Sequence, residues 1–396
     1  MRDPLFRTAL ILGLLSAVGP FAIDMYLPAL PQVAEDLGTT EAGAALTLTA
    51  YFVVFGIAQM IWGPMADAIG RKKPLLIGVG IFLIATILAA LAPDLPTLIA
   101  ARALQALGAA TLMAVPRAVI RDMASGPEAA RMMAAIMIVI SVSPMLAPLT
   151  GSMVLAFGGW REIFGVLALA SVVSLTLIVF ALPETLAPAA RRPIRAGVML
   201  AGAKRLLTDR AFMGLTMIGG FGMASFFVFL ATASFVYTRE FGLSPTGFSI
   251  AFAVNAVGFF SASQLAGRLS GRFGMQRVIA LAISGFMAST MLLALLAWVG
   301  LASLPVVVAG LFVANACLGL VIPTAMVMAM DPHPDIAGLA ASLGGTIQML
   351  TGGLMIVLTG LLFDSSAAGM VGAIAVCGVL AWLSAVASVP MQRLFA

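Results

Sequence analysis

The stretch GPMADAIGRKK, residues 63–73, returns later in the chain as GRLSGRFGMQR, residues 267–277. Two glycines and the final basic residue keep the same spacing, and each copy follows the second long apolar run of its half of the chain. Two parallel halves of this kind build one large class of membrane transporters, with the substrate site between them near the middle of the bilayer. A chance recurrence of glycine and basic residues at short turns is the alternative. We interpret the two stretches as an internal repeat.

The composition indicates a lipid environment. Of the 396 residues, 62% are hydrophobic and only 9% are charged, whereas ordinary soluble domains carry roughly 25% charged residues. A soluble chain this apolar could not cover its surface with polar groups. At about 20 residues per membrane span, the length accommodates about twelve helices. We therefore predict an all-α polytopic membrane protein whose partner is the lipid bilayer. The net charge of +5 does not imply a nucleic-acid partner, because the basic residues fall between apolar runs.

Long apolar runs place the twelve predicted spans, and a basic connector divides them into two sets of six. The spans lie near residues 8–30, 42–66, 74–92, 96–119, 130–157, 161–182, 211–238, 246–270, 276–300, 303–330, 336–363 and 366–390. The connector between the sixth and seventh spans holds three prolines and six basic residues. We predict a first half over residues 1–182, a cytoplasmic linker over 183–210 and a second half over 211–396.

The loop charges predict an orientation. One side of the predicted bundle carries most of the cations, namely Arg2, Arg7, Arg71, Lys72, Lys73, Arg117, Arg121, Arg131, the six in the linker, Arg268, Arg272, Arg277 and Arg393. The other side carries Arg161 and Arg239 together with several acidic residues. Because cytoplasmic loops are enriched in Lys and Arg, we expect both termini to lie in the cytoplasm.

Two isolated charges, Asp24 in the first span and Arg102 in the fourth, mark a candidate coupling site. Burying either costs several kcal/mol unless it finds a partner or water. Each lies about six residues from the outer end of its span, or roughly 10 Å deep, so both could face one cavity. For Asp24 we expect proton exchange, and the alternative is a fixed ion pair that braces two helices. Arg102 does not deprotonate in proteins, so it could organise the cavity, tune Asp24 or contact the substrate.

Polar and aromatic residues within the spans are candidates for the lining of a substrate cavity. They are Tyr26, Tyr51, Gln59, Gln105, Phe226, Phe227 and Asn255. Some amides must line the cavity because amides that face lipid are costly, and aromatic walls suit flat apolar ligands. For any single residue, ordinary helix packing is the alternative.

Other residues are candidates for conformational gating. Pro144 and Pro148 should bend the fifth span, where Gly151 permits the close approach of a neighbouring helix. Pro28 and Pro31 should likewise distort the outer end of the first span.

The cytoplasmic turn with Gly63, Asp67, Gly70 and Arg71 is a second candidate gate. Asp67 lies near the C-terminal end of a helix, where the helix dipole disfavours an anion. We therefore expect it to bind Arg121 or the N-terminus of the eleventh span, in a contact that would hold the halves together. A solvated loop is the alternative.

At this point the whole chain resembles the major facilitator superfamily. The segment from Gly63 through Asp67 and Gly70 to the basic residues that follow is similar to the signature loop of that family. Arg102-x2-Gln105-x2-Gly108 resembles its fourth-span motif, whose Arg is linked to proton coupling. Ala147-Pro148-x2-Gly151 resembles its antiporter motif, with Ala in place of the usual Gly. The resemblance implies the major-facilitator fold, with twelve transmembrane helices in two six-helix halves.

Within that superfamily, the run DMYLPALP, residues 24–31, resembles the first-span signature of the Bcr/CflA drug exporters. That subfamily includes bicyclomycin, chloramphenicol and florfenicol exporters. The aromatic residues of the seventh span and the start of the eighth resemble its amphenicol branch. The resemblance implies a proton-coupled multidrug efflux antiporter of the bacterial inner membrane, with Asp24 and Arg102 as its functional pair. Its expected partners are protons and a small amphipathic drug-like substrate, with chloramphenicol-like compounds as the leading candidates.

Two other functional classes remain open. One is a metabolite exporter or a proton symporter on the same fold. The other is a membrane enzyme or a sensor without transport activity, which we do not expect because the sequence holds a single histidine and no cluster of nucleophile, base or metal ligands. We expect no cofactor and no metal site, and a monomer.

Overall fold

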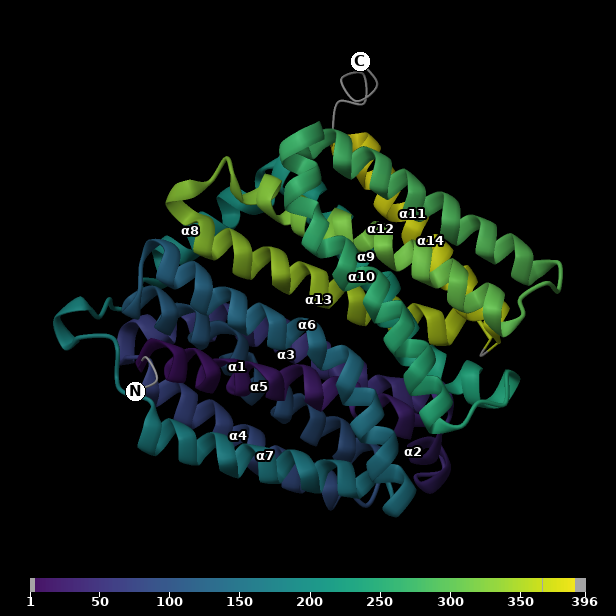
Figure 1. Cartoon of the computed structure of the whole chain (residues 1–396), viewed down its shortest axis with the longest axis horizontal. Coiled ribbons are helices and arrows are strands. Elements are labelled where there is room, and N and C mark those ends of the chain that lie inside the picture. The colour runs from purple at the N-terminus through teal and green to yellow at the C-terminus, as the bar shows by residue number, and fades with distance from the viewer. Residues whose placement is uncertain (1–3, 365, 389–396) are drawn as a thin grey trace. The chain divides into compact units, whose positions relative to one another are not determined.

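The computed structural model describes residues 4–364 and 366–388, and it is helical along nearly all of this length (Figure 1). The positions Arg2 and Arg393, used above for orientation, lie outside the described residues. The long helices are α1 (Pro4–Asp24), α3 (Glu41–Ile69), α4 (Lys72–Ala90), α5 (Leu95–Met123), α6 (Gly126–Phe157), α7 (Trp160–Ala181), α9 (Arg210–Phe235), α10 (Pro245–Phe273), α11 (Met275–Trp298), α12 (Leu304–Met330), α13 (Ala337–Leu362) and α14 (Ala367–Ser388). The shorter ones are η1 (Leu27–Ala29), α2 (Leu30–Asp36), η2 (Pro188–Ala190), α8 (Ala196–Thr208), the π-helix η3 (Val236–Glu240) and η4 (Pro334–Ile336).

The twelve predicted spans are confirmed. Among the described residues, twelve helical segments are long and apolar enough to cross a membrane, and each coincides with a predicted span to within a few residues. The first segment, Arg7–Asp36, is interrupted, because α1 ends at Asp24 before η1 and α2 begin. Pro28 lies in η1 and Pro31 in the first turn of α2, so the expected distortion of the outer end of this span is confirmed.

The chain folds as two compact units. Of the described residues, the first unit comprises 4–39 and 50–195, and the second comprises 40–49, 196–364 and 366–388. In the first unit, α1 packs against α5 and α6, and α4 packs against α5 and α7. In the second, α9 packs against α12 and α13, and α11 packs against α12 and α14. These are the same neighbour relations six spans apart, so the packing of each unit follows the repeat seen in the sequence.

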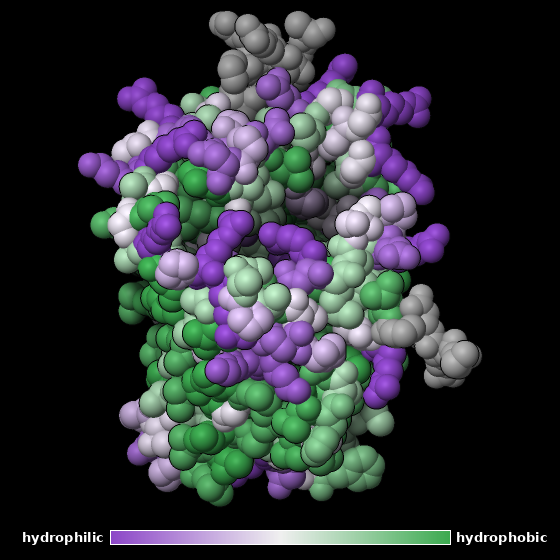
Figure 2. Space-filling model, turned by 90° about the vertical axis from the view of Figure 1, so that its left-hand side faces the viewer, coloured by the Kyte–Doolittle hydropathy of each residue, from purple (hydrophilic) through white to green (hydrophobic). Residues whose placement is uncertain are grey.

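The lateral surface of the helices is apolar. Figure 2 shows hydrophobic residues over the lower part and the left margin of the visible face, and hydrophilic residues across its middle and upper parts. Large apolar side chains stay exposed in the middle of several spans, among them Leu169 at 66% and Ile84 at 58%. In water such a surface would drive aggregation, but in a bilayer it contacts acyl chains. The chain is therefore a multi-pass membrane protein.

Candidate functional site

The first membrane span is broken at Asp24, inside the first unit. The amide of Tyr26 bonds to the carbonyl of Ile23 at 3.3 Å. In a continuous α-helix that amide would bond to the carbonyl of Ala22, four residues earlier. The break therefore removes the helical partner of a carbonyl oxygen within the membrane, where water cannot readily replace it.

Arg102 of α5 supplies the missing donor. Its Nη1 donates to the carbonyl oxygen of Ala22 at 2.9 Å and also to Oε1 of Gln105. Gln105 donates through Nε2 to the hydroxyl of Thr86 on α4 at 2.8 Å. The Arg102 side chain is completely buried. These hydrogen bonds join the broken end of α1 to α5 and α4.

The charge of Arg102 is held by aromatic rings. Its guanidinium carbon lies 4.5 Å from the ring centre of Tyr51, 4.8 Å from that of Tyr26 and 5.8 Å from that of Phe164. A desolvated contact between a cation and an aromatic face stabilises by about 2 kcal/mol. Nε and Nη2 of Arg102 are buried and make no hydrogen bond within the described residues. Two donor nitrogens, with three N–H groups between them, therefore remain available at this site.

Asp24 lies beside this cluster but is not paired with it. Its side chain is 5% exposed, and within the described part of the chain it makes neither a hydrogen bond nor an ion pair. Tyr51 is within electrostatic range of both Asp24 and Arg102. The geometry therefore differs from the fixed ion pair considered from the sequence, because each charge is held separately.

Helix α6 packs directly on the break. A Cβ atom at Gly151 would lie 2.2 Å from the carbonyl oxygen of Met25, the residue after Asp24. Only glycine permits this approach, so the close packing expected at this position is confirmed. Pro144 and Pro148 lie inside α6, which continues as one helix from Gly126 to Phe157 despite both prolines.

The remaining candidates for the cavity lining fall into two groups. Tyr26, Tyr51 and Gln105 surround Arg102 in the first unit. Gln59 of α3 is outside these contacts, and its Nε2 is buried without a hydrogen bond among the described residues. In the second unit, Phe226 and Phe227 of α9 belong to an aromatic cluster, and the side chain of Asn255 of α10 lies close to Tyr237. The sequence did not indicate that three of these residues hold an arginine.

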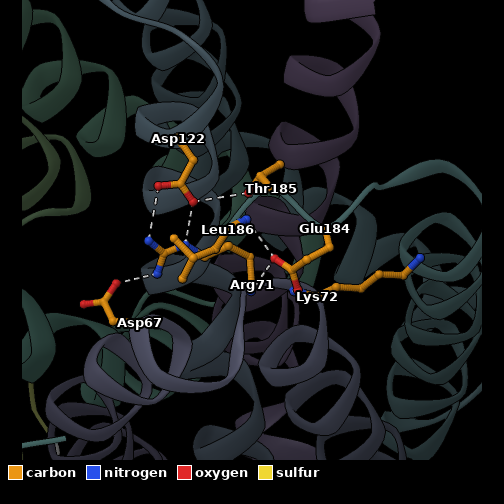
Figure 3. A network of polar contacts seen from close by, with 7 residues as sticks. All are labelled: Asp67, Arg71, Lys72, Asp122, Glu184, Thr185 and Leu186. Carbon is orange, nitrogen blue, oxygen red and sulfur yellow. Dashed lines mark hydrogen bonds and ion pairs between the residues drawn. The ribbon is translucent and has the colours of Figure 1, made fainter. Parts of the chain in front are cut away.

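The turn between α3 and α4 carries a network of charges (Figure 3). Arg71 donates through Nη1 to Asp67 at 2.5 Å and through Nε to Asp122 at 2.7 Å. The partner of Asp67 within this unit is thus Arg71 and not the predicted Arg121. Arg121 lies in the last turn of α5 and is exposed. The sequence did not predict a role for Asp122, because the adjacent Arg121 was expected to bind Asp67 directly.

Glu184 anchors the same turn from the start of the linker (Figure 3). Its carboxylate accepts from the amides of Arg71 at 2.9 Å, Lys72 at 3.2 Å and Leu186 at 3.0 Å. Partial burial raises the pKa of Glu184, but these backbone donors outweigh it and hold the pKa below its ordinary value. Gly70 has a φ of +98°, and a Cβ there would lie 2.5 Å from the Glu184 carboxylate. The sequence feature that could have indicated this contact is Glu184 itself, an acidic residue at the start of a basic linker.

Comparisons with known proteins place the chain among transporters. A model of the Major Facilitator Superfamily matches residues 12–356. An uncharacterized MFS-type transporter of Bacillus subtilis, YdgK, is 35% identical over 94% of each chain. Multidrug resistance protein D of Escherichia coli is 31% identical over 89% of this chain and 88% of its own. A chloramphenicol resistance protein of Pseudomonas aeruginosa is 31% identical over 74% of this chain and 69% of its own.

Solved structures agree on the fold. The D-xylose-proton symporter superposes with a TM-score of 0.76 at 15% identity over 97% of both chains. At that identity the likeness concerns the fold alone. The resemblance to the drug-exporter subfamily, noted from the first-span run at residues 24–31, is confirmed by the relatives named for drug resistance.

Proposed function

Because the chain belongs to the Major Facilitator Superfamily, we propose that it is a proton-coupled antiporter that exports drug-like molecules across the bacterial inner membrane. Relatives named for resistance to several drugs and to chloramphenicol support this substrate class. The loop charges support an orientation with both termini in the cytoplasm. We further propose that the transporter acts as a monomer.

One observation carries the coupling proposal: Asp24 is a buried carboxyl group without a hydrogen bond or an ion pair in the described chain. A protonated carboxyl can stay in this apolar place at modest cost, whereas an ionised one needs a compensating charge or donor. Arg102 cannot release a proton, so it is not the carrier. Asp24 is therefore the group that binds and releases the transported proton.

The neighbouring contacts suggest how proton and substrate compete. When Asp24 is ionised, the N–H groups on the two unused nitrogens of Arg102 and the dipole of a bound substrate can stabilise the carboxylate. When Asp24 is protonated, this stabilisation is no longer needed, and the substrate loses part of its binding energy. Binding of a proton and binding of a drug then exclude one another, which is the requirement for antiport.

The break at Asp24 places the carboxyl group where backbone rearrangement is easy. Short helices η1 and α2 follow the break, and α6 contacts it through Gly151. A change in the charge of Asp24 can therefore alter the packing of α1 against α6. We propose that Pro144, Pro148 and the turn with Gly63, Asp67, Gly70 and Arg71 serve as the moving parts of this change, with Arg121 near the turn.

Replacement of the carboxyl group tests the proposal directly. Asp24→Asn keeps the size of the side chain but cannot ionise, so we expect proton-driven drug export to fall to the background of a pump-deficient host. Downhill exchange of the drug should persist. The measurements are drug susceptibility in that host and uptake into inverted vesicles with an imposed proton gradient. Asp94→Asn is the matched control, because Asp94 is an exposed N-cap of α5. Normal resistance from Asp24→Asn would refute the coupling role.

The same vesicles separate the alternative function. A metabolite exporter or a proton symporter could use the same buried carboxyl group on the same fold. Proton-driven accumulation in inverted vesicles indicates export, whereas accumulation in right-side-out vesicles indicates import. A symporter would be favoured if only the right-side-out vesicles accumulated substrate.

A further inference from the structure

A chain of hydrogen bonds connects Arg102 to the backbone of the neighbouring helix. Helices α4 and α5, which carry its members, lie side by side in the first unit (Figure 1). Gln105 accepts from Arg102 and donates through Nε2 to the hydroxyl of Thr86. That hydroxyl in turn donates to the carbonyl of Phe82 at 2.6 Å. The side chains of Arg102, Gln105 and Thr86 are completely buried, so the chain of bonds is sealed from water.

The direction of each bond follows from the chemistry of its members. The guanidinium of Arg102 carries only donors, so the atom of Gln105 that faces it must be the amide oxygen. The amide nitrogen of the Gln105 side chain then points to Thr86. The single hydroxyl proton of Thr86 is committed to the carbonyl of Phe82, so the hydroxyl oxygen is left to accept. Thr86 therefore stabilises the one orientation of the Gln105 amide that binds Arg102.

The two helices that carry these residues are in close contact. A Cβ atom at Gly108, about one turn after Gln105, would lie 2.4 Å from the carbonyl oxygen of Gly78 and 2.6 Å from the amide nitrogen of Phe82. The backbone of α4 is thus packed directly on α5 at the residue whose carbonyl binds Thr86. This packing keeps the hydroxyl of Thr86 at a constant position relative to Gln105.

The equivalent threonine of the second unit has no such partner. The spacing of the sequence repeat relates Thr86 of α4 to Thr290 of α11. Both hydroxyls donate to the carbonyl of a phenylalanine four residues earlier, and both residues are at most 1% exposed. Among the described residues, however, the hydroxyl of Thr290 bonds only to carbonyls of its own helix. The bond to a glutamine on the next helix is specific to the unit that contains Asp24 and Arg102.

We propose that Thr86 is a positioning residue that holds Arg102 apart from Asp24 and so keeps this carboxyl group free to bind a proton. Gln105 and the carbonyl of Ala22 together hold Nη1 of the guanidinium. Without the hydroxyl of Thr86, the Gln105 amide is free to rotate and Arg102 keeps only the Ala22 carbonyl. The guanidinium can then turn its unused nitrogens toward Asp24 and form an ion pair, which stabilises the ionised carboxylate. This inference rests on the proposed function and deepens it.

Asp24 is close enough to Arg102 for this change. The carbonyl that Arg102 binds belongs to Ala22, two residues before Asp24. Tyr51, whose ring centre lies 4.5 Å from the guanidinium carbon, is within electrostatic range of both charges. A reorientation of the Arg102 side chain therefore changes its distance from Asp24 without moving either helix.

Infrared spectroscopy can follow the protonation of Asp24 in the purified full-length protein without any substrate. The carboxyl C=O band that is present in wild type and absent from Asp24→Asn reports the protonated form. Thr86→Val keeps the shape of the side chain but loses the hydroxyl. We expect the midpoint of the band to move in this variant to a proton concentration about tenfold higher. Gln105→Leu removes the link itself and should give the same change.

Two further variants separate positioning from a merely structural role. Thr86→Ser restores the hydroxyl, so its midpoint should match that of wild type. Thr290→Val removes the equivalent hydroxyl of the second unit and should also leave the midpoint unchanged. A lower unfolding temperature of Thr86→Val with an unchanged midpoint would assign Thr86 a structural role and overturn the inference. An equal change of the midpoint in Thr290→Val would overturn it as well.

Three outcomes separate this inference from the proposed function. If the band of Thr86→Val moves as expected but wild type shows no proton-driven export, the positioning role stands and the antiporter proposal is wrong. If wild type exports in an Asp24-dependent manner and the band of Thr86→Val does not move, the antiporter proposal stands and the positioning role is wrong. A spectrum of wild type without an Asp24-dependent band would overturn both.

Discussion

The two turns of the sequence repeat, between α3 and α4 and between α10 and α11, share a backbone conformation. Gly70 in the first turn has a φ of +98°, and Gly274 at the equivalent place in the second has a φ of +85°. L-residues rarely adopt this region, so both turns need glycine. Beyond the backbone the turns differ, because a Cβ at Gly274 would meet nothing within 4 Å, whereas one at Gly70 would meet Glu184.

Among the described residues, the ion pairs occur in the first turn and not in the second, although the second turn also carries three arginines. Where the first turn has Asp67 and Arg71, the second has Gly271 and Met275. A glycine conformation is therefore required by the shared path of the chain, while the charge network is specific to the first unit. This difference indicates that the network serves a task other than closing a short turn between two helices.

The largest effect should come from adding a methyl group to each glycine. Gly70→Ala must adopt a left-handed conformation and displace the Glu184 carboxylate from its three backbone donors, at a cost of about 3 kcal/mol. Gly274→Ala has only the conformational cost of about 1–2 kcal/mol. Thermal unfolding in detergent would measure both. Equal losses for the two variants would show that the network adds nothing to the stability of the first turn.

A moderate loss of stability is expected when Arg71 of the first turn is replaced by methionine, the residue at the equivalent position 275 of the second turn. Arg71→Met removes the donors to Asp67 and Asp122 and should destabilise by about 2 kcal/mol, because Arg71 is largely buried while Asp67 is half exposed. Drug export should slow as well if the turn is a gate. The reciprocal control Met275→Arg should change stability by less than about 0.5 kcal/mol. A loss as large in that control would contradict the comparison.

The smallest effect should be seen with Glu184→Gln, and it should depend on pH. Because backbone donors lower the pKa of Glu184 in the folded state, its contribution is complete above the unfolded value of about 4.3. That contribution is lost as the pH falls through the lower folded value. The variant should be less stable than wild type by about 1 kcal/mol at pH 7. The gap between the two unfolding temperatures should narrow below about pH 4. A gap that stayed constant with pH would rule out an anchoring role for the ionised carboxylate.

The spans could be predicted from the sequence because each is a continuous apolar run with its own signal. The broken first span was also predictable, since Pro28 and Pro31 cannot donate to a helical ladder. Asp24 and Arg102 could be predicted as functional residues because each is an isolated charge in an apolar run. Such a charge is visible in the sequence without knowledge of which residues pack around it.

The partners of these charges could not be predicted. Arg102 is bound by the carbonyl of Ala22 and by the rings of Tyr26 and Tyr51. A backbone carbonyl has no signature in the sequence, and the rings come from spans whose rotation depends on packing. The same reason explains Asp122, because Arg121 and Asp122 lie about 100° apart around α5 and only the packed helix decides which faces the turn.

The contact between Gly151 and Met25 also limits how the protein can evolve. Every single-base change of a glycine codon that alters the amino acid introduces a Cβ, and each such Cβ would lie 2.2 Å from the Met25 carbonyl oxygen. A phenylalanine codon, such as that of Phe226 in the aromatic cluster, is one base from codons for several other apolar residues. An inhibitor that contacts Gly151 beside the break in the first span would therefore bind a residue that no single-base substitution can replace without disturbing this packing.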